Sequence, residues 1–209
     1  MKVIAINGSP RPDGNCARAL SIIGERLAKE SIGLEVVQVG GEAIRGCIAC
    51  GSCAKTGKCA FGDDLVNATV ERMAAADGII LASPVYYSGV AGTMKCFCDR
   101  AFYVAGAAGG LFRHKVCAAL VAVRRSGGSS TLDCLNHYLT YSEMIVATSR
   151  YWNIVHGRAK GEMDKDAEGV QIVETLGDNL AWVLKMREAS KSLVPEPPAV
   201  PKVFTNFVR

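Results

Sequence analysis

Short apolar runs alternate with amphipathic stretches along most of the chain. The runs end at polar or glycine-containing turns, as buried strands do, and they cover residues 2–6, 34–39, 78–82, 115–123 and 143–148. Apolar residues at helical spacing separate the runs, and they predict helices over residues 15–31, 63–76, 91–104, 129–141 and 166–192. This alternation of strand and helix predicts an α/β protein.

Most of the predicted strands are apolar throughout, with no alternation of polar and apolar positions; residues 116–123 are an example. Continuous apolar strands are typical of parallel sheets whose two faces are both covered by helices. The pattern therefore predicts a doubly wound parallel sheet. Ligands of such sheets bind beyond the carboxyl ends of the strands, so the turns after the first, third and fourth strands are the places to look for a site.

The composition changes near the end of the chain. Four of the seven prolines fall between Pro195 and Pro201, and proline-rich segments favour an extended backbone. We therefore predict one domain over residues 1–194 and an extended arm over residues 195–209. Phe204 and Phe207 are expected to dock on this subunit or on a neighbouring one.

Charge and composition exclude several classes of function. The 209 residues carry a formal net charge of +4 and contain no run of five Lys or Arg residues, so nucleic-acid binding is not expected. The longest apolar run, residues 116–123, is far shorter than the ~20 residues that span a bilayer. The first residues, MKVIAINGSP, are too short an apolar stretch for a secretion signal. We expect a cytoplasmic protein, in which nine cysteines do not form a disulfide framework.

The turn after the first strand, NGSPRPDGNCA, leads directly into a predicted helix. Ser9 and Asn15 supply polar side chains, Arg11 a cation and Gly14 a permissive backbone. The N–H groups at a helix start can bind a phosphate, although neither GxxxxGK[ST] nor GxGxxG is present. The alternative is an ordinary strand-to-helix turn.

Two further turns offer a complementary surface. Pro84, Tyr86 and Tyr87 follow the third strand and provide aromatic surface, and the fourth strand ends in RRSGG, with arginines and glycines at Arg124, Arg125, Gly127 and Gly128. The alternatives are a packed Pro-Tyr turn and a solvated turn. A phosphate pocket, an aromatic wall and a glycine-rich floor together favour a mononucleotide with a planar head.

The stretches GSPRPDGNC and ASPVYYSGVAGTMKCFCDR resemble the signature of the NADPH-dependent FMN reductase family, over roughly residues 1 to 150. The resemblance implies a flavodoxin-like fold with five parallel strands in the order 2-1-3-4-5. It implies FMN, with the phosphate on Ser9, Arg11, Gly14, Asn15 and Cys16 and the ring against Pro84, Val85, Tyr86, Tyr87, Arg124, Arg125, Gly127 and Gly128. It also implies homodimers or homotetramers with flavin sites close to subunit interfaces.

Four cysteines lie in the stretch CIACGSCAKTGKC, at Cys47, Cys50, Cys53 and Cys59. This compact spacing, followed by Asp63 and Asp64, resembles the iron–sulfur flavoproteins, electron-transfer proteins with FMN and a 4Fe–4S cluster. Three thiolates with two intervening residues between successive cysteines can surround a cubane cluster, and a fourth closes the set. A structural zinc ion and four unliganded thiols are the alternatives. Cys96 and Cys98 make a poor chelate, and Cys117 and Cys134 are expected in the core.

No hydrolytic motif such as HExxH or GxSxG occurs, so we expect no catalytic side chain and a flavin that performs the chemistry. The main hypothesis is an FMN-dependent oxidoreductase that takes electrons from NAD(P)H. Its acceptor would be a quinone, a flavin, an azo or nitro compound, or a protein. The alternative is an electron carrier with FMN and a 4Fe–4S cluster, reduced by a ferredoxin-like donor. A third hypothesis is a regulatory module with flavin as its sensor.

Overall fold

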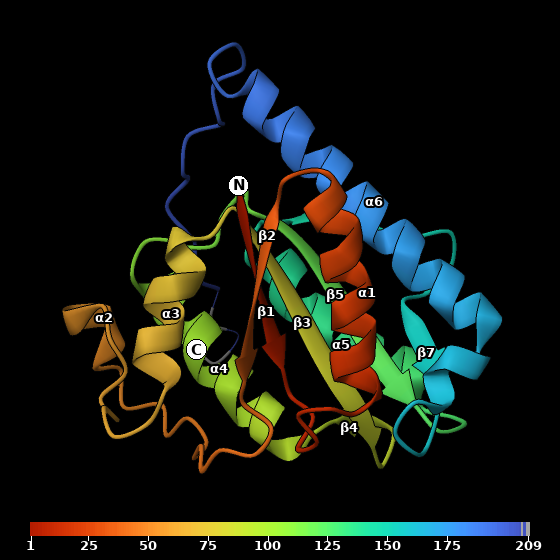
Figure 1. The fold of residues 1–209 in the computed structure, drawn as a ribbon. Coiled ribbons are helices and arrows are strands. Elements are labelled where there is room, and N and C mark those ends of the chain that lie inside the picture. Colours follow the sequence, from red (N-terminus) through yellow and green to blue (C-terminus); the bar gives the residue numbers. More distant parts are fainter. Residues whose placement is uncertain (206, 208–209) are drawn as a thin grey trace.

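The fold is a parallel sheet between two layers of helices (Figure 1). The computed structural model describes residues 1–205 and 207. The strands are β1 (Lys2–Asn7), β2 (Gly33–Gln38), β3 (Gly78–Tyr86), β4 (Gly89–Val90), β5 (Val116–Val123), β6 (Ile145–Val146) and β7 (Ile154–His156). The helices are α1 (Asn15–Lys29), α2 (Cys53–Thr56), α3 (Val66–Ala75), α4 (Gly92–Ala107), α5 (Gly128–Tyr141) and α6 (Ala167–Ser190), with a 3₁₀ turn over Glu162–Lys165.

The main strands follow the order β2-β1-β3-β5-β6, and every neighbouring pair in this path is parallel. This confirms the predicted flavodoxin-like order, because β5 and β6 are the fourth and fifth predicted strands. The apolar residues of β1 and β5, and those of β3 as far as Ala82, are buried on both faces, as their continuous apolar runs predict.

The sheet differs from the prediction in two short strands. β4 forms an antiparallel hairpin with the end of β3. The predicted fifth strand, residues 143–148, is reduced to β6, which pairs with the start of β5, and the unpredicted strand β7 pairs with the end of β5. Asn153 explains the return of the chain to the sheet, since its side-chain amide donates to the carbonyl oxygen of Ala119 at 3.0 Å and its own carbonyl accepts from Val121 N–H at 2.9 Å.

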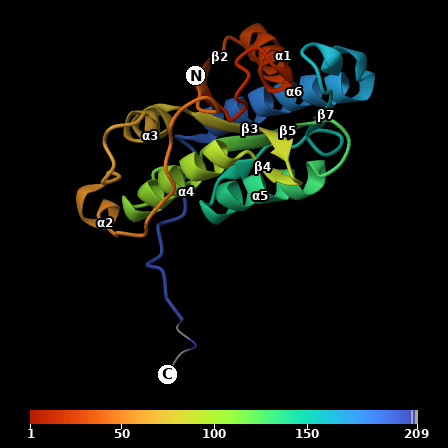
Figure 2. The ribbon, with the colours of Figure 1, turned by 90° about the horizontal axis from the view of Figure 1, so that it is seen from below.

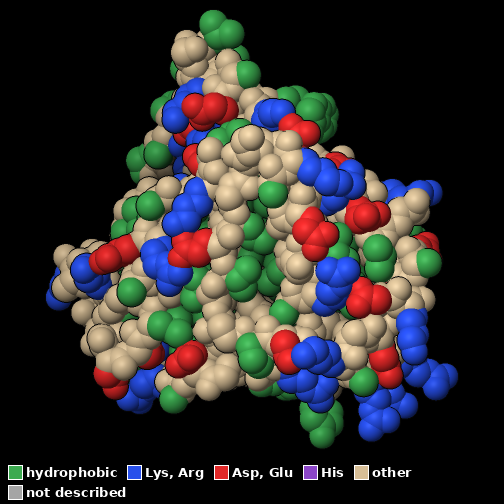
Figure 3. Space-filling view, viewed as in Figure 1, with side chains coloured by type: hydrophobic (Ala, Val, Ile, Leu, Met, Phe, Trp, Pro, Cys, Tyr) green, Lys and Arg blue, Asp and Glu red, His purple; other side chains and the backbone are tan. Residues whose placement is uncertain are grey.

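Each face of the sheet has its own apolar core. The core beneath α1 and α6 contains Leu20, Ile23 and Leu176, and the core on the opposite face contains side chains from α3, α4 and α5. Figure 2 shows α1 and α6 on one side of the sheet and α4 and α5 on the other. On the face drawn in Figure 3, basic and acidic side chains are interspersed. Among the described residues, no helix is long and apolar enough to cross a membrane.

The predicted arm contains neither helix nor strand over residues 195–205 and at 207, while its residues 206 and 208–209 lie outside the described part. Arg113 holds its root by donating to the carbonyl oxygens of Pro197 and Pro198. Farther along, Phe204 is 83% and Phe207 92% exposed. The two rings therefore do not dock on this subunit, and docking on a neighbour stays a prediction.

Candidate functional site

The turn between β1 and α1 is held in a defined shape by its own polar groups. The side-chain oxygen of Asn7 accepts from Ser9 N–H at 3.1 Å, and Ser9 Oγ accepts from Arg11 N–H at 3.2 Å. Gly8 N–H donates to the carbonyl oxygen of Ala82 at 2.8 Å, which ties the turn to the end of β3. The turn is therefore a fixed cradle at the carboxyl edge of the sheet.

The start of α1 fits an anion. Its cap residue, Gly14, has no side chain to accept a hydrogen bond, and the first turn carries no acidic residue, so the positive end of the helix dipole is free of negative charge. Asn15 is buried, and its side-chain oxygen has no hydrogen-bond partner within residues 1–205 and 207. A buried polar atom of this kind costs free energy until a partner arrives.

A segment that sequence reasoning missed lies beside this cradle. Arg11 donates from its guanidinium group to the carbonyl oxygen of Arg158 at 3.0 Å, so its charge is directed toward the segment over residues 157–160. Gly157 lies so close that a Cβ there would be 2.7 Å from the Asn15 side-chain nitrogen. The glycine directly after the short strand β7 is the sequence signal that could have indicated this contact.

Cys16 lies at the start of α1 and is buried. Burial raises the pKa of its thiol to about 12, because a thiolate is disfavoured away from water. The side chain is therefore neutral at physiological pH and adds no negative charge to the cradle.

The structure brings the turns after β3 and β5 into direct contact. Gly127 has a positive φ of 85°, and a Cβ there would lie 2.7 Å from the Ser88 Cα. Ser130 Oγ donates to the carbonyl oxygen of Ser88 at 2.8 Å. The neighbouring rings of Tyr86 and Tyr87 are 49% and 108% exposed, so an aromatic surface stands free beside the joined turns.

A second feature absent from the sequence prediction is a cavity of about 340 Å³ that borders the turn after β5. Arg125 and the residues 126–129 form one wall, and Tyr151, His156 and Glu168 belong to the other walls. Arg124 and Arg125 are both exposed. The 84–88 and 124–128 turns thus combine an aromatic surface with two solvent-exposed cations and close backbone approach.

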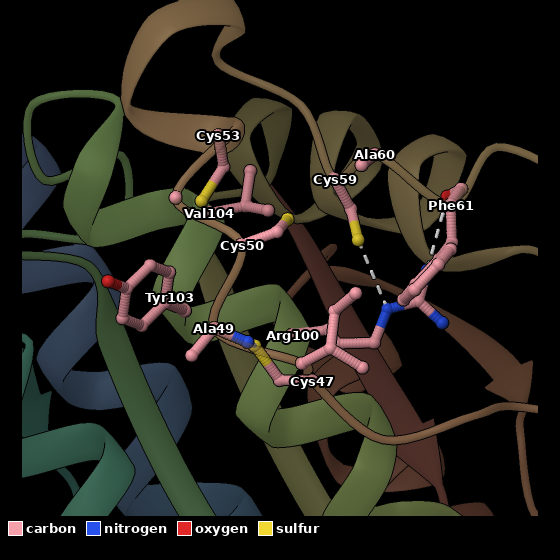
Figure 4. Close-up of a pocket in the computed structure, with 12 residues that line it drawn as sticks. Cys47, Ala49, Cys50, Cys53, Cys59, Ala60, Phe61, Arg100, Tyr103 and Val104 are labelled. Atoms are coloured by element: carbon pink, nitrogen blue, oxygen red, sulfur yellow. Dashed lines mark hydrogen bonds between the residues drawn. The ribbon is translucent and has the colours of Figure 1, made fainter.

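The four cysteines of the compact motif line one pocket (Figure 4). Cys47 and Cys50 are exposed, Cys59 is half-buried and Cys53 is buried. The backbone winds tightly here, as the glycine content predicts, with positive φ angles at Ala49, Gly51 and Gly57. Burial raises the pKa of the Cys53 thiol, and the nearby sulfurs of Cys47 and Cys50 contribute.

Arg100 of α4 lies in the wall of this cysteine pocket. Its side chain is fully buried, and it donates from Nε to the Cys59 sulfur at 3.2 Å and from both terminal nitrogens to Asp64. Burial alone would lower the pKa of this guanidinium, but the hydrogen bonds to Asp64 and Cys59 outweigh it and leave the pKa above the usual value. Asp64 therefore neutralises a buried cation, and α3 begins at Val66 instead of at the predicted Asp63.

The chemistry of the donor set, four cysteine thiols that line one pocket, is that of a 4Fe–4S cluster or of a structural zinc site. Among the described residues, no three His, Cys, Asp or Glu side chains are gathered closely enough for one metal ion. A cubane cluster binds its four thiolates at separate corners, which suits cysteines spread around a pocket wall. The Ala49 N–H also points to the Cys47 sulfur at 3.4 Å.

The remaining cysteines follow the prediction in part. Cys98 and Cys117 are buried, whereas Cys96 and Cys134 are half-buried. Burial raises the pKa of the Cys98 thiol, and it raises the pKa of Cys117 to about 12. These thiols are packing groups, and Cys96 and Cys98 are not among the residues that line the cysteine pocket.

The model of the NADPH-dependent FMN reductase family matches residues 1–159, the part of the chain that contains all three turns and the cysteine motif. The chain belongs to the NADPH-dependent FMN reductase family. Members of this family are flavin-binding oxidoreductases, and the resemblance found in the two sequence stretches is thereby confirmed.

Two relatives of this family member are named iron–sulfur flavoproteins. "Iron-sulfur flavoprotein MJ1083" of Methanocaldococcus jannaschii is 35% identical over 193 residues, which covers 89% of this chain and 98% of the relative. The iron–sulfur flavoprotein of Methanosarcina thermophila is 30% identical over 195 residues, with 91% and 99% covered.

The fold of this family member is also that of a solved flavodoxin-like structure. The flavodoxin, WrbA-like protein from Agrobacterium tumefaciens superposes with a TM-score of 0.61 at 14% identity, over 88% of this chain and 97% of that one. At this identity the likeness shows the fold alone.

Proposed function

We propose that this chain is an FMN-dependent oxidoreductase that takes electrons from NAD(P)H and passes them to a small oxidant or to a protein. The observation that carries the proposal is the buried Asn15 side-chain oxygen, which has no hydrogen-bond partner in the described part of the chain. It lies at an uncapped helix start in a member of the NADPH-dependent FMN reductase family. The phosphate would accept hydrogen bonds from the free N–H groups of the helix start, and a ribityl hydroxyl would donate one to the Asn15 oxygen.

The chain's own residues would bind and orient the cofactor. Ser9, Gly14, Asn15 and Cys16 would surround the phosphate, with Arg11 adding a nearby positive charge. The aromatic surface of Tyr86 and Tyr87, with Pro84 and Val85, would hold the ring against the turn of Arg124, Arg125, Gly127 and Gly128. Bound FMN supplies the redox chemistry, because its ring accepts hydride and releases electrons singly or in pairs.

The test is a visible spectrum of the purified chain, taken with and without added FMN and then with NADPH under anaerobic conditions. We expect stoichiometric flavin binding and bleaching of the flavin bands by NADPH. A chain that neither contains nor binds flavin contradicts the proposal. Flavin binding without reduction by NADPH or NADH contradicts the nicotinamide donor only.

A second candidate function is an electron carrier that combines FMN with a 4Fe–4S cluster and receives electrons from a ferredoxin-like donor. The observation that favours it is the convergence of Cys47, Cys50, Cys53 and Cys59 on one pocket, together with the names of the relatives. A bound cluster supplies one-electron transfer. The helix α4 starts directly after the 84–90 hairpin and reaches the cysteine pocket at Arg100, about 12 Å along its axis, so it would join the two centres.

Iron and sulfide analysis of anaerobically prepared protein tests this candidate. Cys50→Ser should remove iron and leave flavin bound, whereas the control Cys134→Ser, from outside the motif, should keep both. Iron near zero in the wild-type chain after reconstitution with iron and sulfide contradicts the two-centre carrier. Loss of flavin together with iron in Cys50→Ser would show that the loop is primarily structural.

A further inference from the structure

Arg100 is one of the largest fully buried side chains among the described residues. It is the one charged residue among the buried residues of α4 in this part of the chain. It lies on the buried helix face with Phe97, Ala101 and Val104. Burying a guanidinium is costly unless its donors are all used and its charge is balanced. The groups that accept hydrogen bonds from the buried guanidinium therefore indicate what Arg100 does.

The donors of Arg100 are divided among separate parts of the cysteine loop. The terminal nitrogens contact Asp64, the Phe61 carbonyl oxygen at 3.2 Å and, more weakly, the Arg45 carbonyl oxygen at 3.4 Å. The remaining donor, Nε–H, points to the sulfur of Cys59 at 3.2 Å, as Figure 4 shows. One side chain thus connects the beginning of the loop, its last cysteine and the residues that precede α3.

The Arg100 end of this contact is shielded from water, since its side chain is fully buried, whereas Cys59 is half-buried. Two guanidinium groups lie over the Phe61 ring, with the Arg45 group 4.1 Å and the Arg100 group 5.2 Å from its centroid. Electrostatic and hydrogen-bond effects are stronger in such a low-dielectric place. Asp64 balances the charge of Arg100, so the directed Nε–H···S hydrogen bond is the larger influence on the sulfur.

We propose that Arg100 is a positioning residue that fixes Cys59 in the four-cysteine set and raises the reduction potential of the cluster held there. The inference rests on the second candidate function. A cluster ligated by four thiolates gains one negative charge when it accepts an electron, and a donor to a ligand sulfur stabilises that more negative form. Removing the donor therefore shifts the potential to more negative values.

Two variants separate this role from general support of the fold. Arg100→Lys keeps a cation for Asp64 but cannot also direct an N–H to Cys59. The pair Arg100→Gln with Asp64→Asn removes donor and charge together and leaves no unpaired buried carboxylate. The matched control is Lys95→Gln with Asp99→Asn, which neutralises an ion pair of the same helix outside the pocket lining.

The experiment uses the full chain, loaded with FMN and reconstituted anaerobically with iron and sulfide. Iron content, flavin content, melting temperature and the midpoint potential of the cluster are measured in a dithionite titration with redox mediators. We expect both Arg100 variants to bind flavin and to show a more negative midpoint, while the control matches the wild type. Loss of iron with flavin and melting temperature unchanged also supports the positioning role.

Iron-loaded variants with the wild-type midpoint would overturn the proposal. Loss of iron, flavin and thermal stability together in both variants would also overturn it, because Arg100 would then support the fold in general. A wild-type chain that takes up no iron removes the carrier hypothesis and this inference with it. It leaves the FMN-dependent oxidoreductase intact, so the failures are distinguishable.

Discussion

Asn15 is the residue that links the sequence motif most directly to a bound anion. Its amide is buried at the first turn of α1, close to Gly157. A change of charge at this position tests its role, because a carboxylate fills the same space as the amide but repels a phosphate.

We predict that Asn15→Asp weakens FMN binding at least about tenfold, or about 1.4 kcal/mol, without lowering the melting temperature of the flavin-free chain. The helix dipole favours a carboxylate at this position when no anion is present. Fluorescence titration with FMN measures the affinity. The control Asn136→Asp, which makes the same change on α5, should bind FMN normally, and an unchanged affinity in Asn15→Asp would count against the cradle.

Buried thiols give a prediction about pH. The folded pKa of Cys16 and of Cys117 is raised from 9.0 to about 12 by burial, so the unfolded chain loses these protons first. Stability is unaffected below pH 9 and falls as the pH rises from 9 toward 12, by up to about 1.4 kcal/mol per pH unit for each thiol.

Urea unfolding under reducing conditions at pH 8, 9 and 10 measures this slope. Cys117→Ala should start from a lower stability at pH 8, because it leaves a small cavity, but should lose less on going to pH 10 than the wild type. Parallel curves for the two proteins would show that this thiol is not the source of the slope.

At the scale of the elements, the continuous apolar runs predicted β1, β3 and β5 correctly, because burial on both faces leaves no room for polar positions. β2 was also predicted, although this edge strand is only partly buried. The fifth strand was predicted over residues 143–148 and forms only over Ile145–Val146, while β7 was not predicted. β7 follows Asn153, whose side-chain amide bonds to the backbone of β5 in place of a backbone N–H. Propensity patterns do not reveal where a side-chain amide takes the place of a backbone N–H group.

The candidate site, like the strands, was predicted in part. The turns that follow strands could be located from the strands, and the structure joins the 84–88 and 124–128 turns. Arg100 was missed because arginines on helices are usually solvated. Its spacing of three from Phe97 and four from Val104 placed it on the apolar face, a signal that was present in the sequence. The partner Asp64 depends on a long-range contact that no local pattern contains.

The joined turns give a prediction for Gly127. Gly127→Ala should destabilise the chain by about 1–3 kcal/mol and weaken FMN, because alanine is strained at a φ of 85° and its Cβ would overlap Ser88. Gly106→Ala is the control, since a Cβ there meets nothing within 4 Å and alanine favours a helix by up to about 1 kcal/mol. Thermal unfolding and FMN titration of both variants test this prediction. Equal stability and equal FMN affinity of the two variants would show that the contact between Gly127 and Ser88 is loose.

At the scale of the whole molecule, the anchored root and exposed aromatic rings of the arm fit a contact with another subunit. Glu196 binds both His114 and Arg187, so the direction of the arm is set where it leaves α6, and Figure 2 shows it extending from the body. Exposed apolar side chains on a fixed segment are typical of association sites.

We predict that the full chain is a homodimer or homotetramer and that a chain ending at Pro198, which retains the root, associates less strongly. Light scattering coupled to gel filtration across a dilution series measures both. The matched double variant Phe204→Ser with Phe207→Ser should behave like the truncation. A full-length monomer, or a truncated chain with unchanged assembly, would refute the prediction.

The position of helix α4 has a consequence for how the protein could evolve. Its first turn follows the hairpin beside the proposed flavin ring, and its third carries the guanidinium under the sulfurs. A rigid helix of fixed length would therefore set the separation of the two proposed centres, and the loops at either end would determine only what each centre holds. Substitutions in those loops could exchange one redox group for another, or discard it, while the spacing over which an electron travels stays the same.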